Sequence, residues 1–135
     1  MKTFFLFICC LWCHIIDDYF LQGCLANLKQ KSWWQHQLKH HRELDRQQYK
    51  YDYIMALAMH AMSWSFSIMI PLIIVTPTMY LFFCWMFFAN AIIHAFVDDD
   101  KANRHKINLV EDQIVHVMQI VMVVVLWHMQ QPMAK

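Results

Sequence analysis

In the apolar runs of the chain, a histidine and an aspartate lie four positions apart three times. Residues at i and i+4 of an α-helix lie on the same face, one turn apart. Imidazole nitrogens and carboxylate oxygens are ligands for zinc, manganese or iron, and helices commonly present them to a metal in such pairs. The spacing therefore predicts three helix-borne pairs suited to metal binding: His14 with Asp18, His94 with Asp98, and Asp112 with His116.

Two of the pairs lie in one stretch of the sequence, residues 92–117. His94 and Asp98 lie at the end of one apolar run, and Asp112 and His116 lie at the start of the next. The segment between the runs, residues 98–107, is short and charged, so we expect a turn that joins two helices. This arrangement would bring the two pairs together at one end of a helical hairpin.

The composition indicates a membrane protein. The chain has 135 residues, of which 59% are hydrophobic and 16% charged, whereas a soluble domain has about 45–50% apolar and about 25% charged residues. The apolar residues form long runs, and the single glycine and three prolines suit a few long helices with short connections. The net charge of +1 offers no basic field for binding nucleic acid.

The hydrophobic runs are long enough to cross a bilayer, because about 20 helical residues span a hydrocarbon core of about 30 Å. The first run begins like a signal peptide but continues without an Ala-x-Ala cleavage motif, so we expect it to remain as a span. The sequence thus predicts a single all-α integral membrane domain, residues 1–135, built as a four-span transmembrane helical bundle. The spans are expected at about residues 3–25, 53–75, 79–97 and 108–128.

The segment between the first two spans, residues 26–52, is polar and rich in Lys, Arg, Trp and Tyr. Aromatic and basic residues together are typical of an amphipathic segment at a membrane surface. This segment and the turn 98–107 hold nine of the eleven Lys and Arg residues, and the opposite side holds only Lys2 and Lys135. Positive loops favour the cytoplasm, so we expect a multi-pass protein of the cell (inner) membrane with both termini outside.

The three pairs are predicted to meet. In an antiparallel bundle, the end of the first span, the start of the second, the end of the third and the start of the fourth share one side. These ends carry the pairs, and His60 lies near the start of the second span. Ionisable residues inside a bilayer are costly and mark functional sites. One layer facing the cytoplasm should therefore contain His14, Asp18, His60, His94, Asp98, Asp112 and His116.

The polar residues form three ordered blocks: His14, Asp18, Leu21 and Gln22; then His94, Asp98 and Lys101; then Asp112, Gln113 and His116. In the order and spacing of these blocks, nearly the whole chain resembles a family of small bacterial and phage membrane proteins, domain of unknown function 3307. The resemblance implies a shared architecture, with family positions at Lys29 and His60, but it implies no activity. Asp17 stands where the family often has a small residue, which leaves open whether Asp17 or Asp18 faces the site.

This set of side chains suits a divalent metal, zinc above all, bound through nitrogen and oxygen. Seven ligands are enough for one metal with hydrogen-bonding partners or for two metals. The five cysteines form no matched CxxC motifs and largely lie away from the polar layer, so we expect an N/O site.

A membrane-embedded, metal-dependent hydrolase is the favoured function, although the sequence leaves open whether the protein is an enzyme. Its substrate would be an ester, amide or phosphoester of a lipid or small molecule at the cytoplasmic surface of the bilayer. Asp98 or Asp112 would act as the base, and Lys101 would stabilise developing negative charge.

Two alternatives remain open. A His/Asp pair within a span also resembles the ion sites of cation diffusion facilitators, which favours metal-ion binding or transport. The outer halves of the third and fourth spans, around residues 80–88 and 121–127, offer no polar path, and this disfavours transport unless the protein forms an oligomer. The second alternative is that the His/Asp network is not catalytic and only holds the bundle together.

Overall fold

The structure, a computed structural model, describes residues 1–131. Within them, four helical segments are long and apolar enough to cross a membrane. The first consists of α1 (Lys2–Ile16) and a π-helical turn, η1 (Asp17–Leu21), and the others contain α5 (Asp52–Val75), α6 (Tyr80–Ala102) and α7 (Leu109–Met129). The predicted all-α fold with a four-helix bundle is therefore confirmed for this part of the chain.

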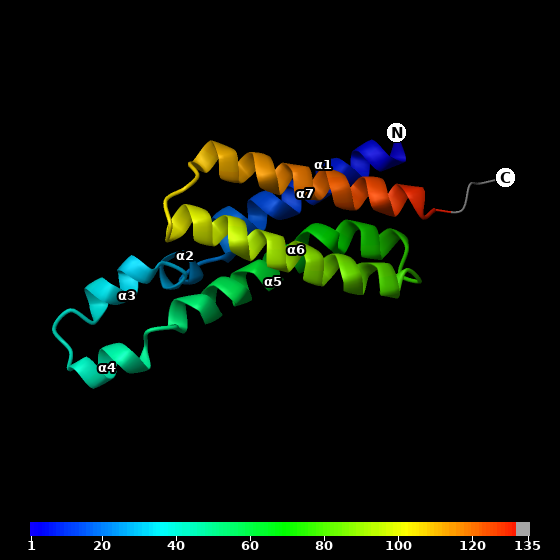
Figure 1. Cartoon of the computed structure of the whole chain (residues 1–135). Coiled ribbons are helices and arrows are strands. Elements are labelled where there is room, and N and C mark those ends of the chain that lie inside the picture. Colours follow the sequence, from blue (N-terminus) through cyan, green and yellow to red (C-terminus); the bar gives the residue numbers. More distant parts are fainter. Residues whose placement is uncertain (132–135) are drawn as a thin grey trace.

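The long helices pack as an antiparallel bundle (Figure 1). α5 packs against α1 and α6, and α7 packs against the same two helices. The start of α1 and the end of α7 lie at one end of the bundle, and α2 (Leu25–Leu28), α3 (Lys31–Gln37) and α4 (Glu43–Gln48) lie at the other (Figure 1). Lys135, which contributes to the predicted charge asymmetry, lies outside the described residues.

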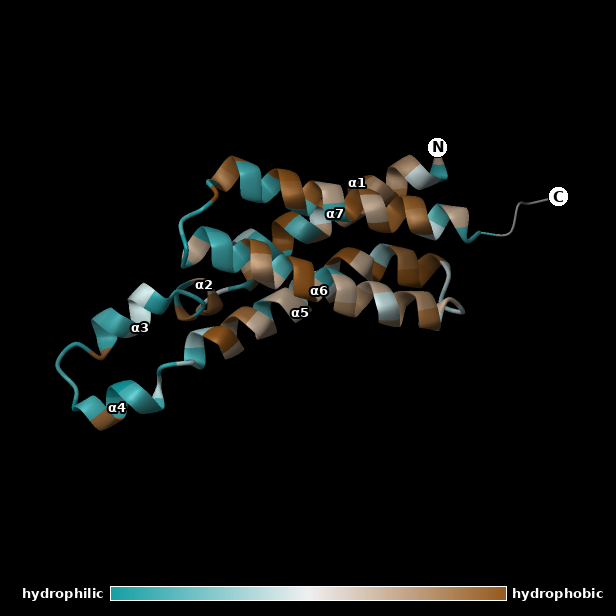
Figure 2. Cartoon of the chain, in the orientation of Figure 1, coloured by the Kyte–Doolittle hydropathy of each residue, from teal (hydrophilic) through white to brown (hydrophobic). Residues whose placement is uncertain are grey.

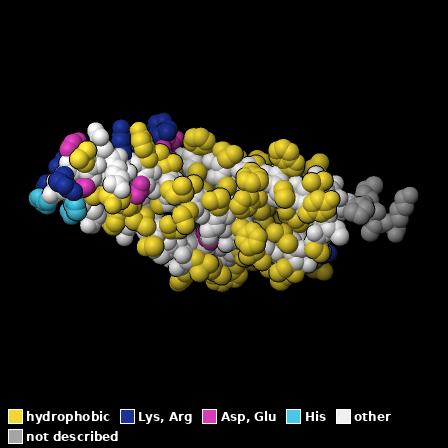
Figure 3. Space-filling view, turned by 90° about the horizontal axis from the view of Figure 1, so that it is seen from below, with side chains coloured by type: hydrophobic (Ala, Val, Ile, Leu, Met, Phe, Trp, Pro, Cys, Tyr) yellow, Lys and Arg dark blue, Asp and Glu magenta, His cyan; other side chains and the backbone are white. Residues whose placement is uncertain are grey.

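Polar and apolar residues separate along the bundle. Hydrophilic residues gather on α3 and α4 and on the link between α6 and α7 (Figure 2). Hydrophobic side chains cover much of the face of the long helices in Figure 3, whereas Lys, Arg and His gather at the end formed by α3 and α4. A broad exposed apolar surface is expected where lipid surrounds a protein. Buried apolar residues fill the interior nearer the termini, and they include Leu6, Cys10, Ile68, Met69, Leu72, Phe83, Ile120, Val123 and Trp127.

The first long helical segment ends at Leu21, before the predicted boundary at residue 25. The chain then turns at Gly23, whose φ of +48° lies in the left-handed region that glycine adopts without a steric clash. α2 follows this turn and packs against α5. The turn thereby directs Lys29, at the end of α2, back towards the bundle.

The third long helix continues beyond the predicted end at residue 97, so residues 98–101 are helical and not part of a turn. The link to α7 is correspondingly short, residues 103–108. Asn108 begins α7 with a capping box: its side chain accepts from the backbone N–H of Glu111, and the Glu111 carboxylate accepts from the backbone N–H of Asn108. The cap fixes where α7 begins.

Candidate metal centre

The π-helical turn η1 explains how two consecutive aspartates both face the protein interior. Its wider turn shifts the register at the end of α1, and π-turns of this kind are frequent at functional sites. Asp17 and Asp18 are both buried, with exposed fractions of 0% and 8%. Oδ1 of Asp18 lies 3.2 Å from Nε2 of His60. Oδ1 of Asp17 accepts hydrogen bonds from the hydroxyls of Ser63 and Ser67, at 2.7 and 2.9 Å, and its Oδ2 lies 3.9 Å from Nδ1 of His60. The choice left open by the sequence is thus resolved in favour of Asp18 as the nearer candidate ligand.

One group of candidate ligands comes from three separate elements: Asp18 from η1, His60 from α5 and His94 from α6. Their ligand atoms lie within 4.8 Å of one another, and all three residues are buried. Nε2 of His60 lies 3.2 Å from Oδ1 of Asp18 and 3.2 Å from Nε2 of His94. Residues that are far apart in the sequence therefore present nitrogen and oxygen atoms to one point.

A second group consists of His94, Asp98 and His116, which are also buried. Nε2 of His116 lies 3.5 Å from Oδ1 of Asp98, and Nε2 of His94 lies 3.8 Å from Oδ2 of the same carboxylate. Because His94 belongs to both groups, the two form one continuous cluster. We call the five residues of these groups the metal centre.

The spacing and hydrogen bonding of the centre fit a bound ion. A tetrahedral ion with ligands at about 2.0–2.2 Å holds neighbouring ligand atoms about 3.3–3.6 Å apart, close to the separations of 3.2–3.5 Å around His60 and His116. Oδ1 of Asp18 and Nε2 of His116 are buried without a hydrogen-bond partner. Buried polar atoms are nearly always satisfied, so these two atoms are free to bind an ion. Among the described residues, Oδ2 of Asp17 and Nδ1 of His60 and His94 likewise lack a partner.

Two lysines neutralise carboxylates at the edge of the centre. Nζ of Lys29 lies 2.5 Å from Oδ2 of Asp98, and Nζ of Lys101 lies 2.5 Å from Oδ2 of Asp112. The Lys29 pair is almost completely buried, whereas the Lys101 side chain is 32% exposed. Lys101, the sequence-predicted stabiliser of negative charge, thus contacts Asp112 at the solvent edge.

His14 and Asp112 lie beside the two ligand groups but outside them. Nδ1 of His14 accepts a hydrogen bond from Nε1 of Trp64 at 2.8 Å, and its Nε2 lies 3.1 Å from Oε1 of Gln113. With Nδ1 as the acceptor, the proton is on Nε2 and is donated to Gln113. Both ring nitrogens of His14 are therefore engaged, and its Nδ1 also lies 3.5 Å from Oδ2 of Asp18, an arrangement that fits a residue orienting a ligand.

Asp112 has three neighbours that define its role. It accepts hydrogen bonds from Lys101 and from Nε2 of Gln113, the latter at 3.0 Å, and its Oδ1 lies 3.3 Å from Nε2 of His116. The carboxylate therefore connects the solvent-edge lysine to a histidine of the centre.

The seven sequence-predicted residues are thus all brought into one region, and five of them form the metal centre. Sequence reasoning missed the inward orientation of Asp17 and the aromatic residue Trp64, whose ring stacks on that of His94 with centroids 4.2 Å apart. Trp64 follows His60 by four residues, one helical turn, so the spacing alone could have placed it on the same helix face as His60. Lys29 was indicated only through the family resemblance.

Comparison with known proteins gives no matching family model, no similar curated protein and no similar solved structure. The resemblance to domain of unknown function 3307 therefore stays a prediction.

Proposed function

We propose that this protein is a membrane-embedded, metal-dependent hydrolase whose divalent ion, zinc as the leading candidate, is held by Asp18, His60 and His94. The observation that carries the proposal is the convergence of these three buried side chains from three elements, with ligand atoms within 4.8 Å of one another. Two imidazoles and one carboxylate are a ligand set of hydrolytic zinc sites, in which a coordination position stays open.

The charges around the centre favour one ion over two. Asp17, Asp18, Asp98 and Asp112 supply four negative charges, and Lys29 and Lys101 supply two positive charges. These groups sum to −2 with all imidazoles neutral, and to −1 with a proton on His116, which lies between the carboxylates of Asp98 and Asp112. One divalent cation is enough to offset either sum. The ligand groups also share His94. A second ion would need a further imidazole and would leave excess positive charge in a region removed from water.

Asp98 is the residue best placed to accept a proton. A bound ion would supply Lewis-acid activation of water. Oδ2 of Asp98 lies 3.4 Å from Nε2 of His60, next to the first ligand group, and Lys29 donates to the same oxygen. We therefore assign Asp98 as the general base through Oδ1, the oxygen that Lys29 does not contact, and Lys29 as the cation that stabilises developing negative charge, in place of the Lys101 predicted from the sequence.

The substrate proposed from the sequence, an ester or phosphoester at the cytoplasmic surface, agrees with the position of the centre. The polar links and α2 to α4 lie at the same end of the bundle as the ligands. Towards the termini, the interior is apolar, with Ile68, Leu72 and Phe83 buried in it. An apolar interior opposes an ion path through a single copy of the chain, so hydrolysis is favoured over transport.

Metal analysis of the full chain purified in detergent tests the proposal. We expect about one zinc per chain in the wild type, and loss of that zinc in His60→Ala and His94→Ala. His128→Ala is the matched control, because His128 is exposed at the terminus end of α7 and should leave the metal content unchanged. Membrane insertion of every variant should be retained, since insertion depends on the apolar spans.

Activity separates the catalytic from the binding part of the proposal. Against a panel of lipid esters and phosphoesters, Asp98→Asn should keep the metal and lose turnover. Protein that contains no metal, with a stability unaffected by zinc or chelator, would support a hydrogen-bonded bundle instead. Bound metal without turnover of any ester or phosphoester would support an ion-handling role.

A further inference from the structure

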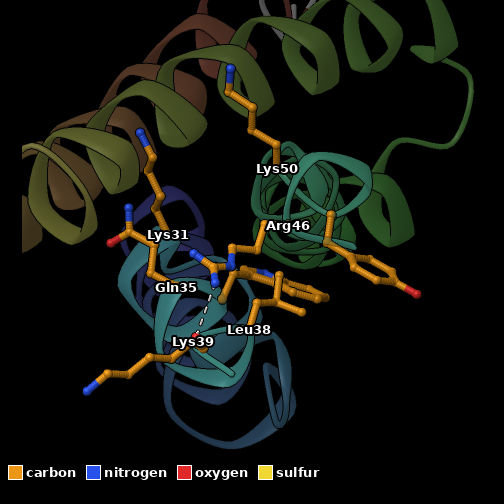
Figure 4. A pocket seen from close by; sticks show the side chains of 8 residues that line it. Lys31, Gln35, Leu38, Lys39, Arg46 and Lys50 are labelled. Atoms are coloured by element: carbon orange, nitrogen blue, oxygen red, sulfur yellow. Dashed lines mark hydrogen bonds between the residues drawn. The ribbon is translucent and has the colours of Figure 1, made fainter. Parts of the chain in front are cut away.

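A second site lies outside the metal centre, between α3 and α4. A cavity of about 470 Å³ is lined by Lys31, Trp34, Gln35, Leu38, Lys39, Arg46, Tyr49 and Lys50. The lining contains four basic side chains and no carboxylate. Figure 4 shows Lys31 and Lys50 extending to the same side of the cavity, beyond Arg46, with Gln35 beside Lys31, whereas Lys39 extends in the opposite direction.

Three of these cations, Lys31, Lys39 and Lys50, have no carboxylate partner among the described residues. Among residues 1–131, no ion pair involves Lys31 or Lys50, although the ammonium of Lys50 lies 5.1 Å from the ring centroid of Tyr51. Arg46, by contrast, pairs with Glu43 at 3.7 Å, and its guanidinium donates to the backbone carbonyl of His41 at 3.1 Å and to that of Lys39 at 3.4 Å. The cavity therefore combines a fixed guanidinium with three uncompensated ammonium groups.

The walls of the cavity are ordered by aromatic contacts. The rings of Trp34 and Tyr49 stack with centroids 6.0 Å apart, which joins α3 to the end of α4. Nε1 of Trp34 donates to the carbonyl of Leu28 at 2.8 Å, and the backbone N–H of Lys31 donates to Oδ1 of Asn103 at 2.7 Å. These bonds connect the α3–α4 segment to α2 and to the end of α6.

The position of the cavity agrees with a membrane surface. α3 and α4 lie beyond the polar end of the bundle, opposite the start of α1 and the end of α7 (Figure 1). Tryptophan and tyrosine beside lysine and arginine are typical of the headgroup region, where cations attract anionic lipids. Phosphate oxygens pair well with guanidinium and ammonium donors.

We propose that this cavity binds the phosphate of an anionic membrane lipid, with Lys31, Arg46 and Lys50 as its donors. The apolar parts of Trp34 and Leu38 pack beside the glycerol or the upper acyl chain. The proposal does not rest on metal binding or hydrolysis, because none of the cavity residues belongs to the metal centre.

Native mass spectrometry of the full chain in detergent, titrated with phosphatidylglycerol or with phosphatidylcholine, tests this proposal. We expect the wild type to bind phosphatidylglycerol more tightly than phosphatidylcholine. The double variant Lys31→Gln with Lys50→Gln should lose about fivefold in affinity for phosphatidylglycerol for each lysine replaced. The matched control is Arg42→Gln with Lys106→Gln, which removes the same charge from the same end of the bundle. Arg42 and Lys106 are exposed, pair with Asp45 and Asp100, and do not line the cavity.

The outcomes distinguish a cavity from general attraction. Retained preference for phosphatidylglycerol in the control and its loss in the cavity variant would support the proposal, provided that both variants unfold thermally at the wild-type temperature. Equal losses in the two double variants, or no preference in the wild type, would overturn it. Displacement of the lipid by an equal concentration of glycerol 3-phosphate would overturn the assignment to a lipid in favour of a soluble phosphate ester.

Discussion

The ammonium nitrogen of Lys29 lies 2.5 Å from Oδ2 of Asp98, a residue 69 positions further along the chain. The side chains are 11% and 3% exposed, so the ion pair is almost removed from water. The same oxygen lies 3.4 Å from Nε2 of His60 in the metal centre. Lys29 and an ion bound by Asp18, His60 and His94 would therefore both lie beside the Asp98 carboxylate, and this relation links the stability of the fold to metal binding.

Replacement of Lys29 by methionine should destabilise the metal-free protein. The Asp98 carboxylate would stay buried without its cation, and breaking a buried ion pair costs about 3–5 kcal/mol. Zinc should restore more stability to Lys29→Met than to the wild type, because the ammonium no longer repels the ion. Unfolding of the purified proteins, followed with and without zinc, measures both effects.

The control for Lys29 is Lys106→Met. Lys106 is 59% exposed and pairs with Asp100 at 3.6 Å, so its loss should cost less than about 1 kcal/mol. Equal stabilities of the two variants would show that the Lys29–Asp98 pair contributes no more than a surface pair.

His14→Ala should lower stability and leave the metal bound. The substitution leaves the indole N–H of Trp64 without its acceptor, at a cost of about 1–3 kcal/mol. His60→Ala provides the comparison, because His60 lies in the first ligand group and its loss should abolish stoichiometric zinc. Zinc content and unfolding of both variants distinguish the roles, and a zinc-free His14→Ala protein would make His14 a ligand.

Asp17 should stabilise the joint between η1 and α5 without binding metal. Ser63→Ala with Ser67→Ala would remove both hydroxyl donors from Oδ1 of Asp17 and should cost about 1–3 kcal/mol for each lost bond to the buried carboxylate. In an Asp17→Leu background, the same serine substitutions should cost little. A double-mutant cycle on unfolding free energies measures this coupling. Additive free energies would rule out the proposed contact, and a change in zinc content would contradict a purely stabilising role.

Both termini should lie outside the cytoplasm. Nine of the eleven Lys and Arg residues lie in residues 26–52 or in residues 98–107, at the end of α6 and in the link to α7, and positive segments of this kind favour the cytoplasm. A periplasmic reporter fused after the last residue should be active, and the same reporter inserted at His40, between α3 and α4, should be inactive. The reverse pattern would invert the orientation and place the metal centre at the outer surface.

Helix geometry made several features of the centre predictable from the sequence. His94 with Asp98 and Asp112 with His116 are one turn apart on their helices, and their nearest nitrogen–oxygen distances are 3.8 and 3.3 Å. This proximity needs only an α-helix, which the apolar runs and their lengths predicted. The alternation of spans also predicted which helix ends meet, so the inclusion of His60 followed from topology alone.

The tertiary structure decided which of the predicted residues contact one another. The rotation of a helix about its own axis and the direction of its long side chains depend on how the helices pack together. The i,i+4 spacing within one helix gives no information about that packing. The turn at Gly23 and the helix α2 direct Lys29 to Asp98, whereas Lys101, three residues after Asp98, turns to Asp112. The π-helical turn likewise directs both Asp17 and Asp18 inward.

The sequence by itself thus determined a membrane bundle with a His/Asp layer at its polar end, because hydrophobic length and helical period act locally along the chain. Only the tertiary structure separated candidate ligands from their supports. Asp18, His60 and His94 present their atoms to one point, whereas both nitrogens of His14 are engaged by Trp64 and Gln113. That distinction depends on the angles at which separate helices meet, and these angles are set by the packing of the whole bundle.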